Sequence, residues 1–130
     1  VTLVAPRTLL PVDLNVGGVN ADNPWALPSV DLEEDLDRAI TGADAVMALR
    51  LQQERMRGAF LPTLREFSRR YQITSARLAL AQPGAMVLHP GPMNEGIEID
   101  ADVAHGAASV IEEQVTNGVA VRMALLYSLI

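Results

Sequence analysis

Short apolar runs alternate along the chain with longer stretches in which apolar residues recur every three or four positions. The short runs have the length and composition of buried strands and lie at residues 2–5, 45–49 and 85–88. Helical spacing occurs at residues 31–40, 63–71, 74–81 and 109–130. This order predicts an α/β fold with a doubly wound, mostly parallel sheet flanked by helices, because strands that alternate with helices pair in parallel.

The first predicted helix follows a long stretch of turn-forming residues. Residues 11–28 are rich in Asn, Gly and Pro and should form a surface excursion. Ser29 is a plausible cap for a helix over 31–40, and Gly42 would end it. The apolar positions of this helix, on one face, are Leu32, Leu36, Ala39 and Ile40.

The last predicted helix is the longest. Ser109 and Glu112 have the spacing of a capping box, which predicts that the helix begins there. The residues that then form an apolar stripe are Val115, Val119, Met123, Leu126 and Ile130. Core packing is the simplest interpretation of this stripe.

Composition narrows the possible functions without selecting one. The 130 residues fit a single domain, 1–130, and their net charge of −6 argues against binding to nucleic acid or to an anionic membrane. The chain has no Cys and two His, which disfavours disulfides and metal sites, and every basic residue is Arg. Because no apolar stretch spans a membrane and no signal-peptide pattern occurs, we expect a cytoplasmic protein.

The stretch from His89 to Gly96 follows the predicted strand at 85–88 directly. Pro90 and Pro92 have no backbone N–H and little φ freedom, so the carbonyls here are held rigidly and can accept hydrogen bonds. Gly91 would let a ligand approach the main chain closely. Ligands of open α/β sheets bind beyond the carboxyl ends of strands, so a site is possible here. An ordinary Pro/Gly turn between a strand and a helix is an equal alternative from this motif alone.

A second polar group follows the strand at 45–49. Alternate residues of an extended chain point the same way, so Arg50 and Gln52 would project together from the strand end, with Glu54 able to orient Arg50. The guanidinium of Arg50 suits a carboxylate, and Gln52 adds amide donors and an acceptor. The alternative is a solvated cluster with no ligand.

Taken together and in this order, the two motifs resemble the aspartate carbamoyltransferase family, specifically the aspartate-binding half of its catalytic chain. The resembling segments are residues 1–6, 8–11, 43–47, 50–56, 64–71, 89–99 and 113–124. The resemblance implies half of a two-domain fold and transfer of a carbamoyl group from carbamoyl phosphate to L-aspartate in de novo pyrimidine biosynthesis. It implies no cofactor and no metal, and a homotrimer for the full-length enzyme.

The resemblance also implies residue roles. Arg50 and Gln52 would hold L-aspartate, and the main chain at Pro90, Gly91 and Pro92 would accept bonds from carbamoyl phosphate and the attacking amine. No side chain of this chain would be catalytic, and His89 would be structural. The terminal helix would pack on the amino-terminal domain, so part of its apolar surface would be uncovered in this chain.

Two departures from the family pattern lower the expected activity of this chain. The Ser-Thr-Arg-Thr phosphate loop belongs to a carbamoyl-phosphate-binding domain that these residues do not include, so the chain alone should be inactive. Glu95 stands where many relatives carry Arg, and an acid there would repel an anionic ligand.

Three other functions can be compared with this one. A dinucleotide site is excluded, because no G-x-G-x-x-G follows a strand. Ornithine carbamoyltransferases would have Ser-Met-Gly in place of Arg50 to Gln52 and a Cys in place of Gly91. A non-catalytic binding or structural module remains open from the sequence.

Overall fold

The computed structural model describes residues 1–10, 30–52 and 63–130. The predicted excursion at 11–28, the cap at Ser29 and the orienting residue Glu54 lie outside these residues. The elements, in chain order, are β1 (Thr2–Val4), β2 (Asp31–Glu33), α1 (Leu36–Ile40), β3 (Ala45–Met47), α2 (Leu64–Tyr71), α3 (Ser75–Leu78), β4 (Met86–Leu88), α4 (Ala101–Ala104) and α5 (Ile111–Ser128).

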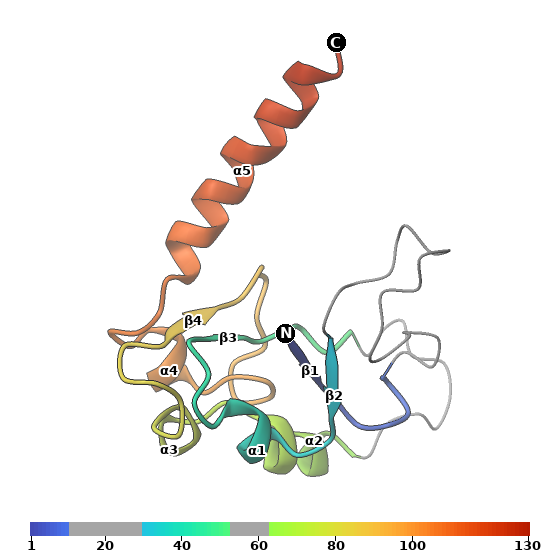
Figure 1. Cartoon of the computed structure of the whole chain (residues 1–130), viewed down its shortest axis with the longest axis vertical. Coiled ribbons are helices and arrows are strands. Elements are labelled where there is room, and N and C mark those ends of the chain that lie inside the picture. The colour runs from blue at the N-terminus through green and yellow to red at the C-terminus, as the bar shows by residue number, and fades with distance from the viewer. Residues whose placement is uncertain (11–29, 53–62) are drawn as a thin grey trace.

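The strands form two parallel pairs. β1 pairs with β2, and β3 pairs with β4. Along the chain α1 lies between β2 and β3, and α2 and α3 lie between β3 and β4. In Figure 1 the short helices α1 and α2 lie together on one side of the strands. The predicted α/β class and its parallel strands are confirmed, and the predicted strands at 2–5, 45–49 and 85–88 all form.

The helix predicted over 31–40 is wrong in its first half. Residues Asp31–Glu33 form β2, because their backbone groups pair with β1 in the register Leu3↔Leu32. The helix begins only after Asp35, whose Oδ1 accepts the N–H groups of Asp37 at 2.9 Å and Arg38 at 3.2 Å. Pairing with a distant strand therefore overrides a helical pattern that only the residues from Leu36 onward fulfil.

The capping box predicted at Ser109 is also wrong. Residues 108–110 run beside β4 instead: the Val87 N–H donates to the Ala108 carbonyl, and the Val110 N–H donates to the Val87 carbonyl. α5 begins at Ile111, with Val110 as its N-cap and no side-chain cap bond. Val87 of β4 thus bonds to the residues on either side of Ser109, and the helix starts later than the capping box predicted.

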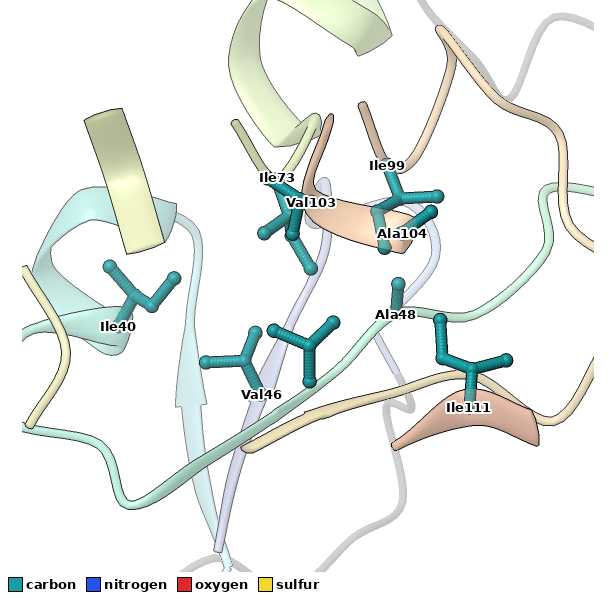
Figure 2. Close-up of a cluster of buried hydrophobic side chains, with 9 residues drawn as sticks. Ile40, Val46, Ala48, Ile73, Ile99, Val103, Ala104 and Ile111 are labelled. Atoms are coloured by element: carbon teal, nitrogen blue, oxygen red, sulfur yellow. The ribbon is translucent and has the colours of Figure 1, made fainter. Parts of the chain in front are cut away.

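The main core lies around β3 and β4. Val87 and Ile99 are fully buried there, and the close-up in Figure 2 shows side chains from strands and helices converging on the β3–β4 pair. The buried members are Ile40, Val46, Ala48, Ile73, Val87, Ile99, Val103, Ala104 and Ile111. This cluster fixes both strands, and with them the segments that continue beyond their carboxyl ends.

A second cluster anchors the chain just after β3. Leu51 is buried against Leu36, Phe67 and Tyr71, and the rings of Phe67 and Tyr71 lie 5.3 Å apart between centroids. Burial raises the pKa of the Tyr71 phenol above its ordinary value, because it disfavours the charged form. The cluster holds the residues on either side of Leu51 in place.

Helix α5 stands away from the rest of the molecule in Figure 1. Only Ile111 of this helix is buried, whereas the stripe residues Val115 and Met123 are 44% and 65% exposed. Core packing of the stripe is therefore wrong within this chain, and the structure leaves the apolar surface uncovered. Among the described residues, no helix is long and apolar enough to cross a membrane.

We expect this uncovered surface to make the chain self-associate, because contiguous exposed apolar patches mark interaction surfaces. Light scattering should show an average mass that rises with concentration. Replacing Met123 and Leu126, which are 65% and 64% exposed, by Glu should shift the chain toward monomer without loss of secondary structure. A chain that stays monomeric at high concentration would contradict this expectation.

Candidate functional site

The candidate site lies at the edge where β3 and β4 both end. The strands run in parallel with Met47 opposite Leu88, and the Ala48 N–H donates to the Leu88 carbonyl at 3.0 Å. The segments that follow, 48–52 and 89–92, therefore leave the same edge from neighbouring strands. Carboxyl ends of adjacent parallel strands are where α/β sheets bind ligands.

Arg50 and Gln52 lie beyond the regular strand, which ends at Met47. Strand alternation predicted a common direction for the two side chains, and Leu51, which lies between them, is buried in the second cluster. Arg50 is exposed and Gln52 half-buried. The buried leucine thus keeps both polar side chains away from the core.

The proline loop, residues Pro90 to Pro92, is exposed at this edge. Gly91 has a φ of 66°, a left-handed conformation that side chains with a Cβ rarely adopt, and the Gly91–Pro92 peptide bond is cis. No hydrogen bond within the described parts of the chain ends on the carbonyl oxygens of these three residues. These carbonyl oxygens therefore have no hydrogen-bond donor among the described residues, and their acceptance of bonds from a ligand stays a prediction.

Directly beneath the exposed proline loop, His89 is completely buried. Its Nδ1 accepts the Gly91 N–H at 2.8 Å, and its Nε2 lies 3.3 Å from Oε1 of Glu98. The same carboxylate oxygen accepts the Asn94 N–H at 2.6 Å. The His89 N–H donates to Oε1 of Gln114 on α5 at 2.9 Å. The sequence predicted a structural role for His89, but no role was predicted for Glu98 or Gln114.

A signal for Glu98 was present in the sequence. It lies between Ile97 and Ile99 in the same short stretch as the proline loop, and an acid flanked by apolar residues there is a candidate partner for His89. Gln114 offered no such signal, because its contact depends on how α5 leaves the core.

Glu95, the departure from the family pattern, has a partner of its own. Its Oε1 lies 3.0 Å from Nε2 of His105, and both side chains are substantially exposed. Glu95 follows the proline loop in the sequence, directly after Asn94. The carboxylate of Glu95 is directed to His105. Glu95 therefore has a hydrogen-bond partner in His105, and its repulsion of an anionic ligand stays a prediction.

A surface hollow of about 810 Å³ lies elsewhere, along α2, and its lining residues are Thr63, Arg65, Glu66, Arg69 and Arg70. It is open and has no buried polar group, so we attach no chemistry to it. Within the described ranges, no group of three or more His, Asp or Glu could hold a metal ion. The β3–β4 edge is the place from which the segments carrying Arg50 and the proline loop both leave the sheet.

Comparison with known proteins gives a consistent result. The family model "Aspartate/ornithine carbamoyltransferase, Asp/Orn binding domain" matches residues 1–129. The chain is 55% identical over 130 residues to the aspartate carbamoyltransferase catalytic subunit of Nocardioides sp., covering 100% of this chain and 37% of that protein. It is 52% identical over 127 residues to that of Dehalococcoides mccartyi, covering 98% and 37%. The chain thus spans little more than a third of these relatives.

Solved structures with the same fold belong to both branches of carbamoyltransferases. Aspartate transcarbamoylase from Trypanosoma cruzi in complex with phosphate superposes with a TM-score of 0.62 at 27% identity, covering 77% of this chain and 31% of that one. Anabolic ornithine carbamoyltransferase from Campylobacter jejuni gives 0.65 at 25% identity, covering 77% and 32%. The fold alone therefore does not choose between aspartate and ornithine.

Proposed function

The chain belongs to the aspartate/ornithine carbamoyltransferase family, as its Asp/Orn binding domain, and on that premise we propose that it is the aspartate-binding half of an aspartate carbamoyltransferase. The observation that carries the proposal is the β3–β4 edge, from which Arg50 with Gln52 and the proline loop both emerge. The complete enzyme, called here the two-domain enzyme, would add a carbamoyl-phosphate-binding domain.

In the proposed reaction the α-amine of L-aspartate attacks the carbamoyl carbon of carbamoyl phosphate. A C–N bond forms, the C–O bond to phosphate breaks, inorganic phosphate leaves, and the amine loses a proton, giving N-carbamoyl-L-aspartate. Arg50 binds an aspartate carboxylate with its planar fork, and Gln52 contributes amide hydrogen bonds. The aspartate is thereby held with its amine free to react.

The proline loop completes the arrangement from the neighbouring strand. Carbonyl oxygens of Pro90, Gly91 and Pro92 accept hydrogen bonds from the carbamoyl NH₂ group and from the attacking amine. Catalysis of this kind rests on positioning and on electrostatic stabilisation, so it needs no covalent intermediate, metal or cofactor. We further propose a cytoplasmic homotrimer that acts in de novo pyrimidine biosynthesis.

The choice of amino acid is the sharpest test of this proposal. The two-domain enzyme, supplied with carbamoyl phosphate, should form N-carbamoyl-L-aspartate from aspartate and no citrulline from ornithine. Arg50 supports aspartate as the substrate. Its cationic side chain would attract the side-chain carboxylate of aspartate and repel the side-chain ammonium of ornithine. Turnover of ornithine would overturn the assignment, and no turnover of either amino acid would favour a non-catalytic binding module.

The placement of the site at the proline loop predicts the effect of Gly91→Val. The Gly91 φ of 66° is unfavourable for a β-branched residue, at about 1–3 kcal/mol of strain, and the nearest atom to an added Cβ is Val115 Cγ2 at 3.9 Å, an ordinary contact distance. The loop should therefore shift, and affinity for a bisubstrate analogue should fall at least about tenfold. Calorimetric titration of the two-domain enzyme would measure it.

Gly84→Val is the matched control. Gly84 has a φ of 86° with nothing within 4 Å of an added Cβ, and it precedes β4 at the opposite end from the loop. Gly84→Val should lower the melting temperature about as much as Gly91→Val does, because the strain is similar. Its affinity for the analogue should be unchanged. Equal loss of affinity in both variants would contradict this placement of the site.

A further inference from the structure

The proline loop has an unusual balance of hydrogen-bonding groups. Pro90 and Pro92 have no N–H, so Gly91 contributes the one backbone donor of the segment. That donor is taken by Nδ1 of His89 at 2.8 Å. What the loop offers to a ligand is therefore a set of carbonyl oxygens, with no N–H among them.

The orientation of the His89 ring is set from its other side. Because Nδ1 accepts the Gly91 N–H, the ring proton must be on Nε2, which donates to Oε1 of Glu98 at 3.3 Å. Glu98 is 3% exposed, and its Oε1 also accepts the Asn94 N–H at 2.6 Å. A buried acid thus fixes both the tautomer of the imidazole and the far end of the loop.

We propose that His89 and Glu98 are positioning residues that make the proline loop acceptor-only, and that this selects a ligand carrying an NH₂ group at the transferred carbon. The inference rests on the proposed function and deepens it. An isosteric acyl phosphate with a methyl group in place of NH₂ cannot donate to these carbonyls and leaves them unpaired. Sites built to bond an N–H discriminate strongly against analogues that lack it.

Substrate discrimination in the two-domain enzyme tests this role. The ratio of kcat/KM for carbamoyl phosphate to that for acetyl phosphate should fall at least about tenfold in His89→Leu, since the Gly91 N–H loses its acceptor. His89→Asn should retain much of the ratio, because an Asn side chain can accept the N–H two residues on. If His89 had a purely structural role, His89→Leu would lower kcat/KM for both substrates by the same factor and leave their ratio unchanged. That result would overturn the proposal.

Glu98 provides a second pair of variants. Glu98→Gln keeps an oxygen for the His89 and Asn94 donors and should preserve the ratio, whereas Glu98→Leu should lower it as His89→Leu does. The control is His105→Asn, which removes the exposed imidazole from the 3.0 Å contact with Glu95 without touching the loop. Its ratio should equal that of the unaltered enzyme, and a fall as large as that in His89→Leu would contradict the assignment.

A measurement without turnover separates this inference from the proposed function. The chain contains two histidines, so ¹⁵N spectra of its imidazoles can be assigned with His105→Asn. His89 should show an unprotonated Nδ1 and a protonated Nε2 at neutral pH, and the opposite tautomer would overturn the inference. If the two-domain enzyme does not carbamoylate aspartate while His89 has the expected tautomer, the proposed function fails and the loop geometry stands.

Discussion

The 130-residue chain, assayed by itself, is expected to form no detectable N-carbamoyl-L-aspartate and to bind aspartate weakly. The Asp/Orn binding domain accounts for residues 1–129, so the groups that hold the phosphate would come from another domain. Arg50 and Gln52 could still contact aspartate, but nothing would fix the carbamoyl group beside its amine. Proximity and orientation account for roughly 7–11 kcal/mol of a two-substrate barrier, and this contribution would be lost.

The measurement is colorimetric detection of the product from the purified chain, with and without a separately expressed carbamoyl-phosphate-binding domain. Adding that domain should restore turnover, because the exposed apolar surface of α5 gives it a place to dock. The matched control is the Met123 and Leu126 double Glu variant, which should respond less to the added domain. Clear turnover by the chain alone would refute the two-domain proposal.

Arg50→Ala in the two-domain enzyme is expected to impair the use of aspartate selectively. Removing a charge-assisted, forked contact with a carboxylate should cost about 2–4 kcal/mol of transition-state stabilisation, or roughly 30- to 800-fold in kcat/KM for aspartate. Because Arg50 leaves β3 and the proline loop leaves β4, the KM for carbamoyl phosphate should change much less. Steady-state kinetics with each substrate varied in turn would measure both.

Two further variants sharpen this result. Arg50→Lys keeps the charge but loses the planar fork, so it should recover only part of the lost activity. Arg65→Ala removes another arginine, from the exposed surface of α2, and should leave the kinetics unchanged. An unaltered dependence on aspartate in Arg50→Ala would remove Arg50 from the proposed site.

Much of the site could be predicted from sequence because its parts are local. The apolar runs at 45–49 and 85–88 predicted β3 and β4, and in a parallel sheet their carboxyl ends must meet at one edge. The exposure of Pro90, Gly91 and Pro92 follows equally from local chemistry, since proline and glycine end a strand without needing distant partners. The roles of these residues toward a ligand remain predictions.

Other features depended on partners far along the chain. Residues Asp31–Glu33 carry a helical pattern, but strand β1 takes up their backbone groups and makes them β2. Ser109 has the spacing of a cap, but β4 pairs with its neighbours first. In both places a backbone hydrogen bond to a distant segment outweighed the small local preference that the sequence displays.

The sequence by itself thus determined the α/β alternation, the two parallel strands of the site and the polar residues that end them. The tertiary structure decided against the core packing that the spacing of the α5 stripe suggests, in line with the uncovered surface that the resemblance implied. It also decided that His89 is buried between Gly91, Glu98 and the start of α5. The physical reason is the same for both. Periodicity reports which side chains are apolar or polar, whereas burial and hydrogen-bond partners depend on which segments the folded chain brings together.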